Sequence, residues 1–537
     1  MAVLGLALGL RLWGLRHGLP YVYNTDENAH FVPNAIGLFG HGWNTHYFVN
    51  PPAFTYLLHA VFAVWFGGRD GVDHAYATDP AAVLVVARAT SALLGTAAVG
   101  LLYLAGARLA GRGVGLLAAA LLAVAFLPVF YGHLALNDGA ALAPVALSLW
   151  GAARVARDGR GRDFALAGAG LGLACATKYT ALVALLPLVG AALVAPRPRA
   201  DVGRGLLVAG LAALAAFVAA DPYAVLAPRE LHGGLAHQLS ATGDAAGKLG
   251  LTQPSGHLYY LWTLTWGLGW LPLAAALAAL PLLWLRDRRL LAMLGPAVVL
   301  FVLVMGLQGR FYGRWLLPVY PVACVLAAVA AVALAERLPR WAGPVLAALL
   351  LGQGLLASVH GDRVLSRPDT RNLARAWLAA HVPAGTRVVV EPINPDAWAS
   401  DVGHALATAN GARFRKWRSL RDVRDGRVVN IEDYERTLFP GLLDRYRRAG
   451  FCWVVSGSTQ RGRAEADPAA VPLANAYYRR LERDATVERR FSPYRVGAGP
   501  VAFNFDWSFD PYPPAYRRPG PDVRIFHLRG RGCEPAP

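Results

Sequence analysis

A series of long apolar segments constrains the fold of this chain more than any other feature. A run of about 18 or more apolar residues predicts a membrane-spanning helix, because it matches the thickness of the hydrocarbon core. The clearest runs are residues 83–106, 113–131, 258–285, 290–306 and 315–335. Only 16% of the 537 residues are charged, against about a quarter in soluble proteins. We therefore predict an all-α, polytopic membrane domain over residues 1–361.

Arginine-rich loops set the expected orientation of this domain, because cytoplasmic loops are enriched in Lys and Arg. Five short loops are rich in Arg: 107–112, 154–163, 196–204, 286–289 and 336–340. Placing them inside puts residues 132–138, 220–257, 307–313 and everything after 361 outside. We expect about eleven crossings with a cytoplasmic N-terminus. The first apolar stretch lacks a basic n-region and an A-x-A site, so we expect a retained helix, whose shortness leaves a truncated start open.

Two segments do not fit a simple count of crossings. Residues 164–195 lie between two basic loops but are too short for two full spans of about 20 residues each. We expect a hairpin of two short helices with Lys178 and Tyr179 near its apex. Residues 51–67 would place the basic loop 107–112 outside if they crossed. We therefore expect them to form an interfacial or re-entrant helix within a first outer loop at 16–82.

Residues 362–537 are richer in charge and contain no long apolar run. One helix-like stretch (NLARAWLAAHV) and three strand-like pieces (RVVVEP, FCWVVSG, VRIFHL) predict a smaller α/β domain outside the membrane. Cys452 and Cys533 could form a disulfide there, since that compartment is oxidising. The aromatic side chains of this domain could present a carbohydrate surface, although core packing explains most of them. They include Trp377, Tyr477, Tyr478, Trp507 and Tyr512.

The basic residues are almost all arginine. The formal net charge is +18, and only three of the 52 basic residues are Lys. Such a charge suits contact with anionic lipid or polysaccharide. No RNA- or DNA-binding motif accompanies it, so we expect no nucleic-acid partner.

Two adjacent carboxylates, Asp26 and Glu27, follow the first helix. Thr25 could cap a helix that starts here, and acids in a first turn complement the helix dipole. The functional alternative is a general base at the membrane surface. Asp26 and His30 are i, i+4 neighbours and could share a proton or a metal ion. A divalent cation is therefore possible, and its identity stays open.

A second set of polar residues lies at the second outer loop and the hairpin apex. His133, Asn137 and Asp138 share the predicted side of Asp26, so carboxylates from two loops can face one cavity; a helix N-cap is the alternative for Asp138. Lys178 lies inside an apolar segment, where an ionisable group is a functional candidate. A compact ammonium suits a phosphate, and snorkelling to the headgroups is the alternative.

Arg310 and Arg314 lie on the outer side, against the positive-inside trend. This exception indicates an anionic partner such as a phosphate, whereas Tyr312 between them also fits an aromatic belt. Acids and cations on one side of the membrane suit sugar transfer from a lipid phosphate. A carboxylate deprotonates the acceptor hydroxyl, and cations stabilise the departing phosphate. Candidates for the walls of the substrate cavity are His30, His133, Asn137, Tyr179 and Tyr312.

The order of these motifs resembles the GT-C superfamily, and within it the phospholipid-carrier-dependent branch of protein O-mannosyltransferases and aminoarabinose transferases. The resemblance covers roughly residues 1–335. It rests on Asp26-Glu27, Asn50-Pro51-Pro52, Arg88, Asn137-Asp138, Thr177-Lys178, Arg310-x-Tyr312 and Pro318-x-x-Pro321. His30 departs from the pattern, which more often has an aromatic residue there, and no WWD-like motif of oligosaccharyltransferases is present.

The resemblance implies a catalytic acidic pair at Asp26 and Glu27, a further acid at Asp138, and contacts to the lipid phosphate at Lys178 and Arg310. It implies an inverting transfer from a polyprenyl-phosphate sugar at the outer face of the bacterial inner membrane. The acceptor stays open: a protein hydroxyl, a lipid, or a cell-envelope glycan.

A membrane transporter or lipid-sugar flippase is the alternative. It would also explain charged groups within the membrane. It predicts inverted repeats, which the sequence does not show. A non-catalytic scaffold of an envelope assembly is a second alternative.

Overall fold

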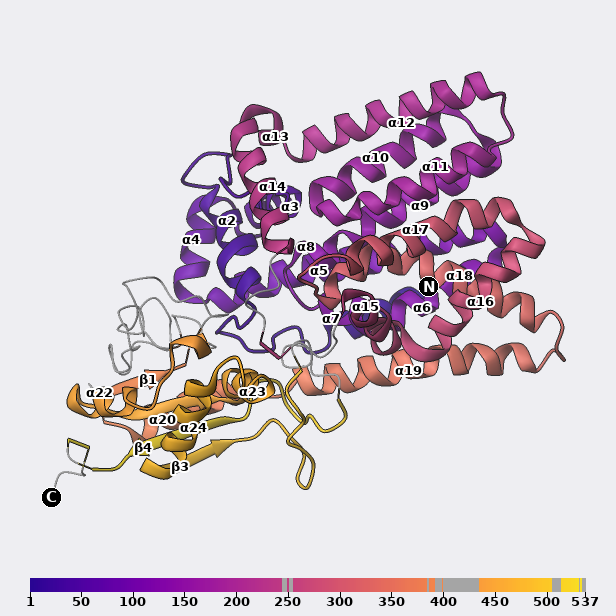
Figure 1. Cartoon of the computed structure of the whole chain (residues 1–537). Helices are drawn as coiled ribbons and strands as arrows, with labels where there is room; N and C mark the ends of the chain where they lie inside the picture. Colours follow the sequence, from indigo (N-terminus) through magenta and orange to yellow (C-terminus); the bar gives the residue numbers. More distant parts are fainter. Residues whose placement is uncertain are drawn as a thin grey trace.

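The computed structural model describes residues 1–243, 249–250, 255–383, 386–391, 398, 434–504, 513–530 and 532–533. It shows a bundle of apolar helices and a smaller α/β domain that lies beyond one end of the long helix α19 (Figure 1). The predicted fold class is confirmed in its outline: a domain of apolar helices, long enough to cross a membrane several times, is followed by a small sheet with helices.

The described residues contain seven helical stretches long and apolar enough to cross a membrane. Four shorter apolar helices accompany them: α1, α3, α6 and the η2–α11 stretch. The count of about eleven crossings stays a prediction. The helices are α1 (Ala2–Leu12), α5 (Pro80–Ala110), α6 (Arg112–Val124), α7 (Phe126–Tyr131), α8 (Asn137–Ala140), α9 (Leu142–Asp158), α10 (Gly161–Thr177), η2 (Tyr179–Ala184), α11 (Leu185–Val194), α12 (Arg199–Ala220), α15 (Gly256–Leu264), η3 (Thr265–Gly269), α16 (Trp270–Arg286), α17 (Arg288–Gly306), η4 (Gly313–Val319), α18 (Tyr320–Ala335) and α19 (Ala342–Leu365).

Local sequence explains where the longest helix, α5, begins and ends. The Asp79 side chain accepts a hydrogen bond from the backbone N–H of Ala81, and Pro80 occupies the first helical position, where its fixed φ suits the start of a helix. The helix stops at Gly111, which has a φ of 97°. Aspartate also caps α17, where the Asp287 side chain accepts from the N–H of Leu290.

The predicted hairpin at residues 164–195 is confirmed. Helix α10 ends at Thr177, Lys178 has an extended backbone, and the chain returns through η2 and α11. Glycines allow α10 to approach α12 closely: a Cβ on Gly168 would lie 2.0 Å from the Ala209 carbonyl oxygen, and one on Gly172 would lie 2.1 Å from that of Ala213. Small residues at such spacing are the usual means of close helix contact in membranes.

The first outer loop is folded rather than extended. It contains η1 (Glu27–Phe31), α2 (Val32–Gly37), α3 (Ala53–Phe66) and α4 (Arg69–Thr78). Two more helices, α13 (Tyr223–Leu226) and α14 (Pro228–Gly243), follow α12, and Figure 1 shows them at the same end of the bundle as α2, α3 and α4. Helix α3 corresponds to the segment predicted to lie at the interface.

The C-terminal domain is built on a four-stranded sheet of order β1-β2-β4-β3, in which only β1 and β2 are parallel. Its elements are α20 (Thr370–His381), β1 (Arg387–Val390), η7 (Tyr434–Thr437), α22 (Leu442–Arg448), β2 (Phe451–Gly457), α23 (Ser458–Ala466), α24 (Pro472–Asp484), β3 (Ala485–Phe491) and β4 (Val523–Leu528). The predicted helix and three predicted strands are confirmed. The fourth strand, β3, was not predicted because it is an edge strand with mostly exposed, charged residues.

Cys452 and Cys533, whose pairing the sequence left open, form a disulfide in the structure. It fastens β2 to the segment after β4, across 81 positions of sequence. Among the aromatic residues considered for a carbohydrate surface, Tyr477 and Tyr478 are buried in the core of the domain. Trp507 and Tyr512 lie outside the described residues.

A buried carboxyl group should make the stability of this domain depend on pH. Glu391 follows β1, is 1% exposed, and accepts hydrogen bonds from the Gly457 N–H (2.7 Å) and the Tyr478 hydroxyl (2.8 Å). Burial raises the pKa of Glu391 from 4.5 to about 7. The folded state therefore keeps a proton that the unfolded chain releases, so stability from this group is complete below pH 4.5 and is lost as pH rises to 7.

The expected loss is about 3 kcal/mol. It is measured by denaturant unfolding of the full chain, followed by tryptophan fluorescence at pH 5 and pH 8. Glu391→Gln should remove the pH dependence, and Glu488→Gln, at an exposed position on β3, should leave it in place. Equal stability of the parent chain at both pH values would contradict the prediction.

Candidate active site

The two adjacent carboxylates of the first outer loop have different surroundings. The side-chain oxygen of Asn24 accepts hydrogen bonds from the backbone N–H groups of Asp26 and Glu27, each at 3.1 Å. Asn24, and not Thr25 as the sequence suggested, therefore caps the helical turn. The Asp26 side chain remains 32% exposed, whereas that of Glu27 is 1% exposed. The two acids thus serve different purposes in the fold.

Glu27 is fully occupied by a buried ion pair. The Arg88 guanidinium donates to both carboxylate oxygens, Nε to Oε1 at 2.7 Å and Nη2 to Oε2 at 2.8 Å. The backbone N–H of Ala135 also donates to Oε1 at 3.0 Å. Such bidentate, charge-assisted bonds are strong. Through these bonds Glu27 links the second outer loop and α5 to the first outer loop.

Arg88 was predicted only as part of the family resemblance, and the structure gives it a defined task. Its remaining amino group, Nη1, donates to the carbonyl oxygens of Leu15 (2.8 Å) and His17 (2.9 Å). The intramembrane arginine in an otherwise apolar helix was the available sequence signal, because such a charge needs a buried partner.

Four charged side chains from four separate segments meet at one place, and we call them the ion cluster: Asp26, Asp138, Lys178 and Arg314. The Lys178 ammonium lies 2.7 Å from Asp138 Oδ1. The Arg314 guanidinium lies 3.1 Å from Asp26 Oδ2 and 3.8 Å from Asp138 Oδ2. Two carboxylates are thereby balanced by two cations, as buried charges require.

Accessibility distinguishes the members of the ion cluster. The side chain of Asp138 is 2% exposed and that of Lys178 is 10%, whereas Arg314 is 21% and Asp26 is 32% exposed. Lys178 points to Asp138 within the protein, which disfavours the snorkelling interpretation. Asp26 is the carboxylate that a solvent-borne acceptor can reach.

Of the two outer arginines, Arg314 joins the ion cluster. Its guanidinium lies over the Tyr312 ring at 4.4 Å, a cation–π contact. Tyr312 in turn packs edge-on against Trp315 at 5.2 Å. Arg310 is half-buried, and its backbone N–H donates to the carbonyl oxygen of Thr242 at 3.0 Å.

A polar wall extends from the ion cluster along the first outer loop. His30 stacks on Tyr47, with ring centroids 4.3 Å apart. The Asn50 amide donates to the Tyr47 hydroxyl at 3.0 Å, and the Asn137 amide donates to Asn50 Oδ1 at 3.4 Å. Burial lowers the pKa of His30, and the nearby charge of Asp26 opposes that shift. A neutral imidazole therefore prevails at neutral pH. Tyr47 and Asn50 were not among the predicted wall residues.

The hairpin apex contacts the same loop. The Tyr179 hydroxyl donates to the carbonyl oxygen of Phe48 at 3.0 Å. The Asn137 amide also donates to the carbonyl oxygen of Thr177 at 2.9 Å. These bonds connect α8, the hairpin and the first outer loop.

His133 does not join this wall. It is 0% exposed, its Nδ1 lies 2.9 Å from the Val129 carbonyl oxygen, and its Nε2 lies 2.9 Å from that of Trp13. Nε2 also lies 3.3 Å from the buried carboxylate of Asp362 on α19. His133 therefore belongs to a separate buried cluster that packs α1 and α19 against the second outer loop.

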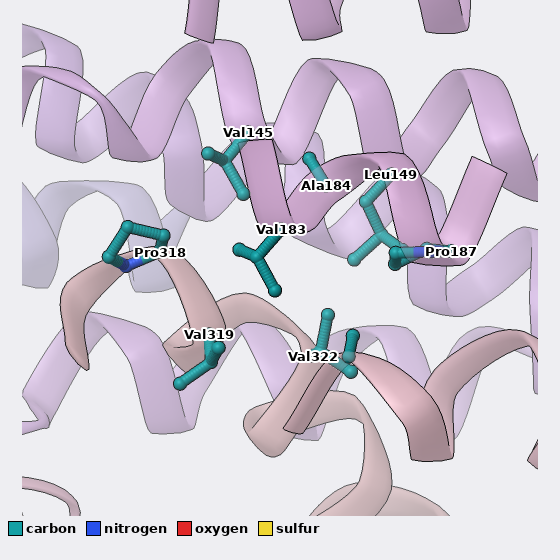
Figure 2. A pocket seen from close by; sticks show the side chains of 9 residues that line it. Val145, Leu149, Val183, Ala184, Pro187, Pro318, Val319 and Val322 are labelled. Carbon is teal, nitrogen blue, oxygen red and sulfur yellow. The ribbon is translucent and has the colours of Figure 1, made fainter. Parts of the chain in front are cut away.

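A small apolar pocket is lined by segments that lead away from the ion cluster. Figure 2 shows Val145, Val183 and Val322 pointing into a common space. Val145 lies seven positions after Asp138, and Val183 lies five after Lys178. The lining residues are Val145, Leu149, Val183, Ala184, Pro187, Ala297, Pro318, Val319 and Val322. The space has room for about one water molecule, so we regard it as a packing void between the helices and not as a ligand site.

Within the described residues, no three His, Cys, Asp or Glu side chains are placed to hold a metal ion together. Asp26 and His30, predicted to share a proton or a metal, have no third protein ligand in that part of the chain.

Comparison with known proteins finds one family whose model matches part of the chain. Residues 81–221 match the family model of the dolichyl-phosphate-mannose-protein mannosyltransferases. The matched segment is about a quarter of the chain; it contains Asp138 and Lys178 and ends at Asp221. No curated protein sequence matches the chain.

Solved structures show a distant likeness to this chain. The Cupriavidus metallidurans ArnT bound to undecaprenyl phosphate is 20% identical with a TM-score of 0.45; the match covers 71% of this chain and 66% of that one, just under two thirds. The Archaeoglobus fulgidus oligosaccharyltransferase is 14% identical with a TM-score of 0.49, covering 94% and 74%. The mycobacterial arabinofuranosyltransferase AftD is 18% identical with a TM-score of 0.42, covering 98% and 41%.

Proposed function

We propose that this chain is a glycosyltransferase that moves a sugar from a polyprenyl-phosphate carrier to an acceptor hydroxyl, with inversion at the anomeric carbon. The ion cluster is the observation that carries the proposal, because it holds a reachable carboxylate next to two cations. A transfer from a lipid phosphate needs a base for the acceptor and positive charge for the leaving phosphate.

In the proposed reaction, Asp26 accepts the proton of the acceptor hydroxyl. The acceptor oxygen attacks the anomeric carbon from the face opposite the phosphate, the bond from that carbon to the phosphate oxygen breaks, and polyprenyl phosphate leaves. Lys178 and Arg314 stabilise the negative charge that develops on the phosphate. Asp138 holds both cations in place. A single displacement inverts the anomeric configuration.

The donor class is supported by the family match. The matching family is named for a dolichyl-phosphate sugar donor.

The location is part of the proposal. Five arginine-rich loops support an ion cluster on the outer face of a bacterial inner membrane, with the N-terminus in the cytoplasm. The Cys452–Cys533 disulfide suits an oxidising compartment for the C-terminal domain. The acceptor is then a hydroxyl of a protein, a lipid or an envelope glycan.

Lys178→Met tests the phosphate-binding part of the proposal. The variant should lower kcat/KM for the polyprenyl-phosphate sugar about 10- to 1,000-fold, because one charge that stabilises the transition state is lost. The measurement is transfer or hydrolysis of radiolabelled sugar by the reconstituted full chain. Arg229→Gln, at an exposed site on α14, is the matched control and should retain parental rates.

The possible donors are separated by testing a panel of polyprenyl-phosphate hexoses and pentoses. The corresponding nucleotide sugars are tested in parallel. Release of sugar from the lipid donors alone supports the proposal. No release from any lipid-linked sugar by the parental protein would contradict it.

A further inference from the structure

Five arginines surround the place where α19 ends and the C-terminal domain begins. We call them the junction patch: Arg363, Arg367, Arg495, Arg517 and Arg518. Two come from the last turn of α19 and the residues after it, and three come from the connection between β3 and β4. Outer-side arginines run against the positive-inside trend, so their grouping needs a partner.

Backbone contacts hold the patch together. The Arg367 guanidinium donates to the carbonyl oxygen of Arg517 at 3.2 Å. The backbone N–H of Arg517 donates to the carbonyl oxygen of Pro493 at 2.6 Å, and that of Arg495 donates to Ala515 at 2.9 Å. The segments that contain Arg495 and Arg517 therefore lie side by side against the end of α19.

The described residues supply no acidic counter-charge to the patch. Within the described ranges, none of the five guanidinium groups forms a salt bridge to a carboxylate, whereas Arg480, Arg490 and Arg524 of the same domain are each paired with Asp or Glu. The neighbouring acid Asp369 is occupied by Arg371 at 2.8 Å. Burial and the charges of Arg517 and Arg367 lower the pKa of Arg518, which reflects mutual repulsion that an anion would relieve.

An apolar residue projects from the same surface. Val496 is 97% exposed and follows Arg495 in a tight turn closed by the Ala498 N–H, which donates to the Arg495 carbonyl oxygen at 3.0 Å. An exposed apolar tip beside cations is the arrangement of segments that enter the headgroup region of a bilayer.

The connection between β3 and β4 reaches back along the membrane helix. The His360 imidazole lies 3.2 Å from the carbonyl oxygen of Pro513, and His360 precedes the end of α19 at Leu365 by five residues. At about 1.5 Å of rise per residue, this contact lies about 8 Å before the end of the helix. The patch therefore lies beside the stretch of α19 where its apolar sequence gives way to His360, Asp362 and Arg363, and a helix that crosses a bilayer leaves the hydrocarbon core at such a change.

We infer that the junction patch binds anionic phospholipid headgroups, with Val496 inserted among them, and that this contact fastens the C-terminal domain to the bilayer. Guanidinium groups pair with phosphates. Each basic residue near an anionic membrane surface strengthens binding about fivefold. The inference does not depend on sugar transfer, since it concerns the surface of the domain and not the ion cluster.

The experiment places the full chain in nanodiscs of phosphatidylcholine alone, or with about one third phosphatidylglycerol, and measures amide hydrogen exchange in residues 493–498 and 515–518. Anionic discs should slow exchange in these segments at least tenfold relative to neutral discs. Salt at about 0.5 M should weaken the effect, because it screens surface charge. Equal exchange in both disc types would overturn the inference.

Two variants test the assignment to these residues. The triple variant Arg363→Gln, Arg495→Gln, Arg517→Gln should abolish the difference between the discs, as about a hundredfold of affinity is lost. Val496→Asp should reduce the difference in exchange between the two disc types while all five arginines stay in place. The control Arg445→Gln, Arg448→Gln, Arg479→Gln removes three exposed arginines from α22 and α24 and should keep it.

Three further outcomes are informative. Retained lipid protection in the triple variant would assign the patch to another partner and overturn the inference. Protection by soluble inorganic phosphate equal to that by phosphatidylglycerol would also overturn the inference. A parental rate of sugar transfer by the triple variant in detergent, with lost lipid protection, would support a surface role that is separate from catalysis.

Discussion

Asp26→Asn should lower the turnover of lipid-linked sugar about 10²- to 10⁴-fold, the range typical for removal of a general base. Asparagine keeps the size of the side chain and a hydrogen-bond acceptor for Arg314, which lies 3.1 Å from Asp26 Oδ2. It cannot accept the acceptor's proton. The loss should therefore fall mainly on kcat, with a smaller effect on the KM for the donor.

Asp70→Asn is the matched control for this prediction. Asp70 lies in α4 of the same outer loop and is exposed, so its replacement should leave the rate within about twofold, as expected of a surface site. Transfer and thermal unfolding are measured on the same preparations. Near-parental turnover of a well-folded Asp26→Asn protein would place the base elsewhere.

Arg88→Ala should destabilise the membrane domain by about 3–5 kcal/mol, because it leaves the Glu27 carboxylate buried and uncompensated. Both side chains are nearly inaccessible, at 2% and 1% exposure. The variant also frees the carbonyl groups of Leu15 and His17. The unfolding midpoint in detergent and the yield of monodisperse protein measure the effect.

Comparison with an exposed ion pair makes the result specific. The Arg108–Asp158 pair is 44% and 26% exposed, and Arg108→Ala should cost less than about 1 kcal/mol. The double variant Glu27→Gln with Arg88→Met should recover much of the stability lost in Arg88→Ala, since no charge is then left unpaired. If Glu27→Gln folds normally but transfers no sugar, Glu27 has a chemical role that its placement does not reveal.

The membrane domain could be predicted well from the sequence because hydrocarbon imposes strong rules on it. Each apolar run had to be a helix, and the positions of the basic loops on either side of residues 164–195 were enough to predict the hairpin at Lys178. Asp26, Asp138 and Lys178 were expected on the same side of the membrane, and for this reason the sequence predicted that they could face one cavity. Residues 51–67 contain the short helix α3, and their place at the membrane interface stays a prediction.

The details that failed are those that depend on side-chain direction. Adjacent Asp26 and Glu27 look equivalent in sequence, but the π-helical turn at Glu27–Phe31 sends one to the ion cluster and the other into the core. Arg310 and Arg314 are likewise alike in sequence, and only the short helix η4 decides which one reaches Asp26. His133 sits five residues before Asp138, yet its ring turns to α19. Strand β3 was missed because an edge strand lacks the alternation that marks a half-buried one.

The origin of the ion cluster has a consequence for biogenesis. Asp26 and Arg314 pair across 288 positions, with Asp138 and Lys178 supplied in between. A ribosome-bound nascent chain therefore has no complete set of charges until most of the membrane domain has been inserted. During that interval the early carboxylates and Lys178 need other partners in the translocon or in water, and no fragment that stops before η4 can carry the complete site.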